Sequence, residues 1–327
     1  EMIVWGGTGG HSGCCTQLES GGRYDAQTDS WRPTSIGPGV PASRSGHSAV
    51  WTGTEMIVWG GDVNGFGAVN GGARYNPIGD TWTPTSTSGA PSPRTGHDAA
   101  WAGSRMIVWG GGVTTGGRYD PTTDSWTPTS LVNAPAARTN GTAVSTGSKM
   151  IVWGGCGVGS GCFTPLNTGA IYDPGADTWT TASTSGAPAG RYDLTSIWTG
   201  SKMIVWGGCA NAQCSTQFND GGRYDLAGDA WAPVDVTTSP CQRSGHSAVW
   251  TGTEMIVWGG CDGGGLQLVL NTGGRYNPVT NSWVATSTEN AADSRGGHTA
   301  VWTGAEMIVW GGHVNSGQTS AGKRHDP

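Results

Sequence analysis

The sequence is poor in charged residues, lysine and phenylalanine, and it has no long hydrophobic run. Of its 327 residues, 12% are charged and three are lysines, and the formal net charge is -6. This balance provides no basic surface for nucleic acid or for an anionic membrane. No apolar run approaches the roughly 18 residues that a membrane-spanning helix needs. We therefore expect neither nucleic-acid binding nor membrane insertion.

Glycine is the residue in excess, with 59 copies. Because glycine interrupts helices and supplies turns, the composition predicts short strands, frequent turns and no long helix. The chain begins at Glu1, directly before a strand that elsewhere follows another strand. We therefore expect it to start within a repeat of a longer parent chain, so that the lack of a signal peptide carries little weight.

A six-residue stretch, Met-Ile-Val-Trp-Gly-Gly, comes back seven times and organises the whole chain. The copies begin at Met2, Met56, Met106, Met150, Met203, Met255 and Met307. They are 44 to 54 residues apart, and every methionine of the protein heads one copy. A repeat of this length is typical of stacked or closed repeat architectures. We therefore predict one repeat domain over residues 1–327.

Each full repeat reads as four short strands. In one copy these are residues 95–101, 106–109, 117–120 and 126–129, joined by glycine or Asp-Pro turns. The spacing from the arginine before strand one to the methionine of strand two is 12 residues in all six cases, and that from the tyrosine of strand three to the tryptophan of strand four is seven. Both hairpins therefore have a fixed length. Almost all length variation falls in the loop between strands two and three.

A hydrophobic strand ending in Gly-Gly, followed by Tyr-Asp and then Trp at fixed spacing, resembles the kelch repeat, and the chain looks like a secreted kelch protein of bacterial type. The resemblance covers the whole chain and implies an all-β propeller with one four-stranded blade per repeat. Departures are few: Ile171 and Ala170 replace Arg and Gly, and His325 replaces a tyrosine. None of them threatens the fold.

The number of blades follows from counting strands. The chain has seven copies of strands two and three but only six of strands one and four. We favour seven blades, the first lacking its inner strand and the last its outer strand, with both supplied by the parent chain. The alternative is six blades with residues 306–327 left outside.

All 18 tryptophans fall into three repeated columns, at the ends of strands one and two and at the start of strand four. Large rings repeated in every blade are typical of packing between blades. A tryptophan-lined sugar platform is the alternative, which columns shared by all blades disfavour.

In a four-stranded meander the variable loops share one face with the loops between blades, and all eight cysteines lie there. The even count predicts disulfides and an extracellular or cell-surface location. The proximity of cysteines suggests pairing Cys156 with Cys162, Cys209 with Cys214 and Cys241 with Cys261. Cys14 and Cys15 are adjacent, so a vicinal bridge, free thiols and intermolecular bonds all stay open. Zinc is disfavoured because no histidine stands at ligand spacing.

Six arginines enter strand one from the same face and should ring the mouth of the channel. They are Arg44, Arg94, Arg138, Arg191, Arg243 and Arg295. The kelch resemblance implies that arginines near this point can recognise acidic peptides, so we predict that these six, with Phe66 and Phe163, contact an acidic peptide or anionic glycan. The alternative is that each arginine satisfies loop carbonyls in its own blade.

No catalytic constellation is evident, and we predict no cofactor, no metal and no catalytic residue. His47, His97, His246 and His298 stand three residues after the arginine and are expected to bond between blades. Galactose oxidase is a kelch enzyme, but only Tyr192 lies outside the tyrosine column, so its ligands are missing. We predict a non-enzymatic binding or structural module with a protein or glycan partner. The alternative is a propeller enzyme, which would need Asp62, Asp220, Asp262 and His313 to converge.

Overall fold

The structure is a computed structural model and describes residues 1–9, 16–64, 66–159, 162–262 and 268–326. Throughout these residues the backbone forms strands and turns and no helix. Nothing in them has the length and hydrophobicity of a bilayer-spanning helix. The frequent glycines and the short hydrophobic runs such as Met56–Trp59 account for this architecture, because they favour short strands joined by tight turns.

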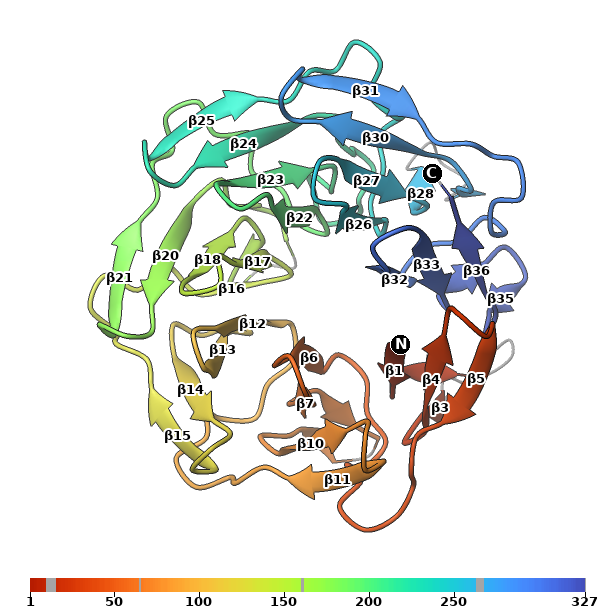
Figure 1. Cartoon of the computed structure of the whole chain (residues 1–327). Coiled ribbons are helices and arrows are strands. Elements are labelled where there is room, and N and C mark those ends of the chain that lie inside the picture. The colour runs from red at the N-terminus through yellow and green to blue at the C-terminus, as the bar shows by residue number, and fades with distance from the viewer. Residues whose placement is uncertain (10–15, 65, 160–161, 263–267, 327) are drawn as a thin grey trace. The chain divides into compact units, whose positions relative to one another are not determined.

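Each repeat folds as one antiparallel sheet, and we number the seven sheets as blades 1 to 7 in chain order (Figure 1). Blade 1 has the order β1-β4-β5, with bounds Met2–Trp5, Gly21–Asp25 and Ser30–Pro33. Blade 2 has the order β6-β7-β10-β11, with bounds Ser48–Trp51, Met56–Trp59, Gly72–Asn76 and Thr81–Pro84. Blade 3 has the order β12-β13-β14-β15, with bounds His97–Ala102, Arg105–Gly110, Gly116–Asp120 and Ser125–Pro128.

The later blades follow the same plan. Blade 4 has the order β17-β18-β20-β21, with bounds Thr142–Ser145, Met150–Trp153, Gly169–Asp173 and Thr178–Thr181. Blade 5 has the order β22-β23-β24-β25, with bounds Thr195–Trp198, Lys202–Trp206, Gly221–Asp225 and Ala230–Pro233. Blade 6 has the order β26-β27-β30-β31, with bounds Ser247–Trp250, Met255–Trp258, Gly273–Asn277 and Ser282–Ala285. Blade 7 has the order β32-β33-β36, with bounds Thr299–Trp302, Met307–Trp310 and Gly322–His325.

Strands of two residues lie in the loops between strands two and three and at the entry to strand one. They are β2 (Thr8–Gly9), β3 (Thr16–Gln17), β8 (Asp62–Val63), β9 (Gly67–Ala68), β16 (Arg138–Thr139), β19 (Cys156–Gly157), β28 (Cys261–Asp262), β29 (Leu268–Val269), β34 (His313–Val314) and β35 (Gly317–Gln318). The pairs β2 with β3, β8 with β9, β28 with β29 and β34 with β35 are small hairpins. The variable loops therefore have secondary structure of their own.

Seven sheets of one repeated kind are the blades of a β-propeller, and the predicted fold class is confirmed. Blades 1 and 7 have three strands each. Blade 1 lacks the strand before β1, and blade 7 lacks the strand after β36, as the strand count predicts. Seven blades with an incomplete first and last, and not six, is therefore the arrangement of this chain.

The contacts group the residues into two compact units. One contains residues 1–151 and 170–181, and the other contains residues 152–169 and 182–327. Blades 1 to 3 lie in the first unit and blades 5 to 7 in the second. That residues 1–327 form a single domain stays a prediction.

Glycine is required at two places in each repeat. In blade 2 the pair Gly60 and Gly61 has φ angles of 69° and 91°, which L-residues rarely adopt, so the pair ends β7 and turns the chain into the loop. A Cβ on Gly72 would lie 1.9 Å from the carbonyl oxygen of Val58. The first residue of strand three must therefore be glycine because the two strands approach too closely for any side chain.

The core consists of tryptophan pairs between consecutive blades. The strand-two tryptophan of one blade packs on the strand-four tryptophan of the next, as Trp59 does on Trp126 with ring centroids 5.4 Å apart. The same contact joins Trp5 to Trp82, Trp109 to Trp179, Trp153 to Trp231 and Trp206 to Trp283. The prediction that these two columns pack one blade on the next is confirmed.

The sequence predicts the same packing between blades for the strand-one tryptophans, and here the structure differs. Trp51 is 49% exposed, and the others of its column are partly exposed. They lie beside the turn that joins strands one and two, where the neighbouring blade does not cover the whole ring. This column therefore belongs to the margin of the core.

A second repeated contact joins the opposite ends of the blades, where strands three and four meet. In blade 3 the Tyr119 hydroxyl donates to Asp124 Oδ1 at 2.7 Å, and the same oxygen accepts the backbone N–H of Ser86 from blade 2 at 2.9 Å. Trp126 Nε1 donates back to the Ser86 carbonyl at 2.9 Å. One carboxylate thus fixes the turn of its own blade and the strand-four exit of the preceding one.

Candidate functional site

The loop end of each blade brings the predicted site residues together. The residue that follows the glycine pair forms a backbone β-bridge with the residue that follows the strand-one arginine. These backbone pairs are Ser45 with Asp62, Tyr192 with Cys209, Ser244 with Cys261 and Gly296 with His313. Arginines, cysteines and variable loops therefore share one end of their blades, as the meander topology predicts.

The six strand-one arginines are buried. Their exposed fractions lie between 0 and 5%. In blade 3 the Arg94 guanidinium donates through Nη1 to the carbonyls of Gly110 and Thr115, at 2.8 and 2.7 Å, and through Nε to the Ser92 carbonyl at 2.9 Å. Arg44, Arg191, Arg243 and Arg295 make the equivalent bonds in blades 2, 5, 6 and 7.

This arrangement favours the structural alternative for the arginines. The guanidinium donates to the carbonyl of the first glycine of the pair and adds a second donor to the carbonyl before strand three, which in blade 2 also accepts the N–H of Gly60. Burial lowers the pKa of Arg94 and of Arg243 below that of an exposed arginine. Arg191 also pairs with Asp220, at 2.8 Å between Nη1 and Oδ1, and lies over the ring of Phe218. That these arginines contact a ligand stays a prediction.

Phe66 and Phe163 lie on the surface, in contrast to the arginines. Their exposed fractions are 85% and 65%. Phe66 follows β8, and the turn that carries it is tied to blade 1 because the Asn64 N–H donates to Gln17 Oε1 at 2.7 Å. Phe163 directly follows a cysteine of a disulfide. Each ring is therefore presented to solvent by a turn that has a specific tie.

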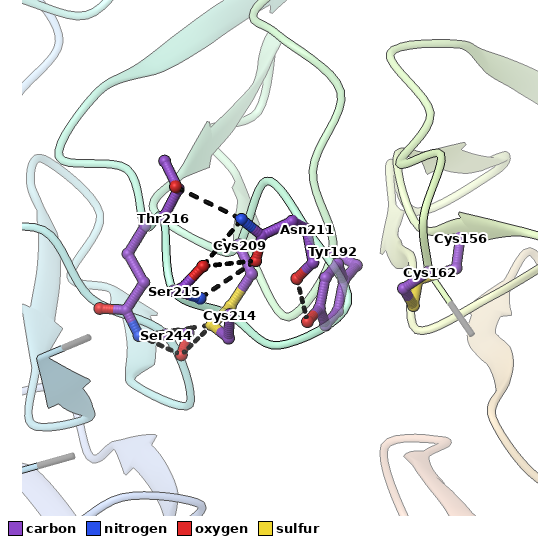
Figure 2. Close-up of a disulfide and its surroundings, with 10 residues drawn as sticks. Cys156, Cys162, Tyr192, Cys209, Asn211, Cys214, Ser215, Thr216 and Ser244 are labelled. Atoms are coloured by element: carbon purple, nitrogen blue, oxygen red, sulfur yellow. Dashed lines mark hydrogen bonds between the residues drawn. A yellow bond between two sulfur atoms is a disulfide. The ribbon is translucent and has the colours of Figure 1, made fainter. Parts of the chain in front are cut away.

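Two of the predicted disulfides are present (Figure 2). Cys156 is bonded to Cys162, and Cys209 to Cys214, with Cα atoms 4.8 and 5.0 Å apart. Each closes a short segment within one loop, as predicted from the spacing. These two predicted bonds are therefore confirmed. The extracellular or cell-surface location of the protein stays a prediction.

Polar contacts surround the Cys209–Cys214 loop. The Asn211 carbonyl accepts the Tyr192 hydroxyl at 2.7 Å, and its amide bonds to Ser215, as Figure 2 shows. Gln217 Nε2 donates to the Ser244 hydroxyl of blade 6 at 2.9 Å. The hydroxyl of Tyr192 is thereby committed to a backbone carbonyl, and no cysteine is bonded to its ring.

The predicted bond between Cys241 and Cys261 is wrong, since both are free thiols. The Cys241 sulfur accepts a hydrogen bond from Arg243 Nη2 at 3.2 Å. The Cys261 sulfur lies 3.4 Å from His313 Nε2, in the next blade. Each side chain is therefore turned toward a different neighbour. Cys14 and Cys15 lie outside the described residues.

The histidine column bonds between blades, as predicted. His97 Nε2 lies 2.9 Å from the Ser48 hydroxyl of blade 2, and its ring stands edge-on to Trp59 with centroids 5.2 Å apart. The equivalent hydrogen bonds join His246 to Thr195 and His298 to Ser247. His47 makes the same ring contact with Trp5.

Burial keeps these imidazoles neutral. It lowers the pKa of His97 and of His47 to about 4 and that of His298 to about 3, with the arginine of the same blade adding to the effect. A group that is neutral over the whole physiological range is poorly suited to general acid and base catalysis near pH 7. The column therefore serves blade packing.

Asp98 is a residue that the sequence argument missed. It lies in β12, where blades 2, 5 and 6 have Ser48, Thr195 and Ser247. Burial raises its pKa to about 7, with the charge of Arg138 opposing the shift. The sequence does carry a signal for this residue. In blade 3 an aspartate stands where every other blade that has this strand carries a hydroxyl side chain, and the next blade carries Gly141 in place of the histidine.

The residues proposed for an enzyme site have separate roles. Asp220 pairs with Arg191, and Asp62 accepts a hydrogen bond from Gln17 at 3.3 Å. Within the described residues, no group of three or more histidines, cysteines and acids could hold a metal ion. The structure therefore offers side chains for recognition at this end of the blades, and it places His313 beside the Cys261 thiol, with 3.4 Å between Nε2 and Sγ.

Comparison with known proteins agrees with this description. The sequence model of the Attractin/LZTR1 β-propeller family matches residues 2–270. Among curated proteins, Adagio-like protein 1 of Oryza sativa subsp. japonica is 30% identical over 167 residues, which is 47% of this chain and 25% of that protein. Adagio protein 3 of Arabidopsis thaliana is 31% identical over 144 residues, or 42% of this chain and 23% of that protein. The chain thus spans about a quarter of the length of these relatives.

Proposed function

Because the chain belongs to the Attractin/LZTR1 β-propeller family, we propose that it is a non-enzymatic module of the cell exterior that binds a protein partner through its strand-two to strand-three loops. The observation that carries the proposal is the pair of exposed phenylalanines, Phe66 and Phe163, each held by a tied turn. Aromatic rings presented in this way bind with little loss of conformational freedom, so they are effective anchors.

The composition of these loops supports a protein partner over a glycan. The large exposed side chains of the loops include the apolar Val158 and Leu268, at 58 and 52% exposure, beside the two phenylalanines. Apolar and aromatic side chains are typical of the centres of protein interfaces. A glycan, in particular an anionic one, would need cationic or planar polar side chains in the same loops, and the six arginines are buried beneath them.

The disulfides support the proposed location. Bonds such as Cys156–Cys162 and Cys209–Cys214 persist in oxidising compartments and are rare in reducing ones. Both bonds lie in the loops that the proposal assigns to binding. In an oxidising location outside the cell the two disulfides would stay formed. The loops would then stay closed, and Phe163 would keep its position.

Selection of peptides from a displayed random library, with the whole chain immobilised, tests this proposal. The dissociation constants of selected peptides would be measured for the wild type, Phe66→Ser, Phe163→Ser and Ile78→Ser. Ile78 is the matched control, since it is 93% exposed but lies in the turn at the other end of blade 2. We expect at least one phenylalanine variant to weaken binding by about tenfold or more, and the control to bind as the wild type does.

Two results would contradict the proposal. Peptides that lose affinity only with Ile78→Ser would place the binding surface at the other end of the blades. A library that yields no peptide, together with a glycan array that yields ligands sensitive to the phenylalanine variants, would keep the surface and replace the class of partner.

A further inference from the structure

A cavity of about 280 Å³ lies between blades 6 and 7, whose inner strands β26 and β32 pack on each other (Figure 1). It lies beside the turn between strands one and two of blade 6, at the end of the blades opposite the variable loops. Its walls include Thr251, Glu254, Ile256, Arg275, Trp302 and Asp326. Two carboxylates and one guanidinium give this lining a formal charge of -1.

Trp302 supplies an aromatic wall. Its ring packs on the core beside Val249, Ile256 and Met307, and part of the ring surface stays exposed. A tryptophan that is fixed by the core and borders a cavity can contact a cation or an alkyl chain without losing conformational freedom.

The carboxylate of Glu254 is held at the cavity and can accept further hydrogen bonds. The turn that carries it is fixed, because the Glu254 N–H donates to Thr251 Oγ1 at 2.9 Å. Its Oε2 lies 4.0 Å from Arg275 Nε, which is too far for a hydrogen bond. The Glu254 side chain is 27% exposed, so its charge is screened less than that of a fully exposed carboxylate.

Asp326 lacks the cation that accompanies its equivalents in other blades. In blades 3, 4 and 5 the aspartate that ends strand three pairs with the residue before the strand-two methionine. These pairs are Asp120 with Arg105, Asp173 with Lys149 and Asp225 with Lys202. In blade 7 the position of the cation holds Glu306, which is itself bonded to Arg324 at 2.7 Å. The excess negative charge of the cavity therefore lies at Asp326.

The charge and the aromatic wall together favour an organic cation as the occupant. An anion would meet an excess of negative charge. Among the residues that the structure describes, no group of three or more histidines, cysteines and acids is placed to hold a metal ion. An alkylammonium ion would use every part of the lining, because its N–H groups match the two carboxylates and its alkyl chain matches the tryptophan.

We propose that this cavity is a binding site for a free, small primary alkylammonium ion. The ammonium group donates to the carboxylates of Glu254 and Asp326, and the alkyl chain packs on Trp302. Arg275 balances the charge of one carboxylate, and the ligand balances the other. The site is independent of the protein partner proposed above, since it lies at the other end of the blades.

n-Butylammonium chloride is the probe, and the whole chain is the test protein. Isothermal titration calorimetry at low ionic strength should show saturable binding of one ion per chain, with a millimolar Kd. n-Butanol has the same alkyl chain without the charge and should bind at least tenfold more weakly. Sodium chloride should weaken the binding of n-butylammonium, because salt screens the charges at the partly exposed carboxylates.

Two variants carry residues that other blades already have at the same positions. Glu306→Lys places a cation beside Asp326, as in the pair of Lys202 with Asp225, and should weaken binding by about tenfold or more. Trp302→Ser removes the aromatic wall, as Ser145 does in blade 4, and should weaken binding by about fivefold or more. Trp198→Ser is the matched control, because Trp198 belongs to the same column and does not line the cavity. It should bind as the wild type does.

Three results would overturn the proposal. They are no saturable binding to the wild type, equal affinities for n-butylammonium and n-butanol, and equal binding by the wild type and Glu306→Lys. If Trp302→Ser does not fold, Asp326→Asn replaces it, since this substitution removes the charge and keeps the shape of the side chain. It should weaken binding by about tenfold.

Discussion

Each strand-one arginine ties together the segments that meet at the loop end of its blade. There the chain leaves its sheet at a glycine pair, and the guanidinium bonds to the carbonyl of the first glycine and to that of the residue before strand three. A guanidinium carries five N–H groups in a fixed plane, so a single arginine can serve three carbonyls on different segments. This demand explains why the arginine recurs in every complete repeat, with or without a ligand.

Removal of one of these arginines should destabilise the protein. Arg94→Ala leaves the carbonyls of Gly110, Thr115 and Ser92 without their donor, and we expect the free energy of unfolding to fall by about 2–4 kcal/mol. Arg105→Ala is the control, because its pair with Asp120 is partly exposed and 3.9 Å long, and it should change stability by less than about 0.5 kcal/mol. Urea unfolding measures both. If Arg94→Ala kept its stability and instead lost affinity for a selected peptide, the predicted ligand role would be correct.

A second prediction concerns the turn at Asp124, between strands three and four of blade 3. Asn281, at the same position in blade 6, is its natural control. Asp124 has a φ of 48°, accepts two hydrogen bonds, and is matched in blade 6 by Asn281, which bonds to Tyr276 and to the Asp235 N–H in the same way. Asp124→Asn should therefore change the free energy of unfolding by less than about 0.5 kcal/mol, while Asp124→Ala should lower it by about 2 kcal/mol. Thermal and urea unfolding measure the difference. Equal losses from the two substitutions would show that charge, and not the side-chain oxygen, holds the turn.

At the scale of elements, blades contact each other through a few repeated groups. Trp59 and Trp126 fill the space between blades 2 and 3, while the His97 to Ser48 bond closes its loop end. The Asp124 turn closes the opposite end. Apolar packing supplies most of the stabilisation, and the hydrogen bonds at both ends set the register of one blade on the next.

The buried histidines should make stability depend on pH. The pKa of His97 is about 4 in the folded protein and near 6.5 in the unfolded chain, so the unfolded state binds more protons between these values. The stabilisation is fully present above about pH 6.5 and is lost as the pH falls toward 4, by about 2 kcal/mol for this residue at pH 5. His97→Gln should lose less stability than the wild type between pH 7 and 5 in urea unfolding. Parallel pH curves for the two proteins would contradict the assignment.

The cysteines should separate into bonded and free groups. Peptide mapping without reductant should find Cys156 linked to Cys162 and Cys209 to Cys214, and the exposed Cys241 should react with iodoacetamide faster than the half-buried Cys261. Closure of loops of this size stabilises by about 2 kcal/mol each, so a reductant should lower the Tm. Labelling of Cys156 or Cys209 in the untreated protein would contradict the pairing.

At the scale of the whole molecule, the repeated interfaces predict one cooperative unit. Blades 2 to 6 share the strand-two and strand-four tryptophans and the turn between strands three and four, so these contacts offer no weaker boundary. We expect calorimetry of residues 1–327 to show a single transition, with equal calorimetric and van't Hoff enthalpies. Two transitions would instead agree with the two units, residues 1–151 with 170–181 and residues 152–169 with 182–327, as separate folding domains.

The sequence by itself determined the blades. Strand identity, hairpin length, the incomplete first and last blades and the two loop disulfides all depend on residues within one repeat, where spacing and turn chemistry are read directly. The placement of Pro128 in the outermost strand β15 follows from the same local reasoning, because proline cannot donate to a second neighbour.

The tertiary structure alone decided what happens between repeats and which side chains stay accessible. Arg94 is buried rather than displayed, Cys241 and Cys261 turn to different neighbours, and Trp51 is half exposed. The partners of these residues come from another strand or from a blade about 50 residues away, so their burial depends on a packing arrangement that local spacing does not specify.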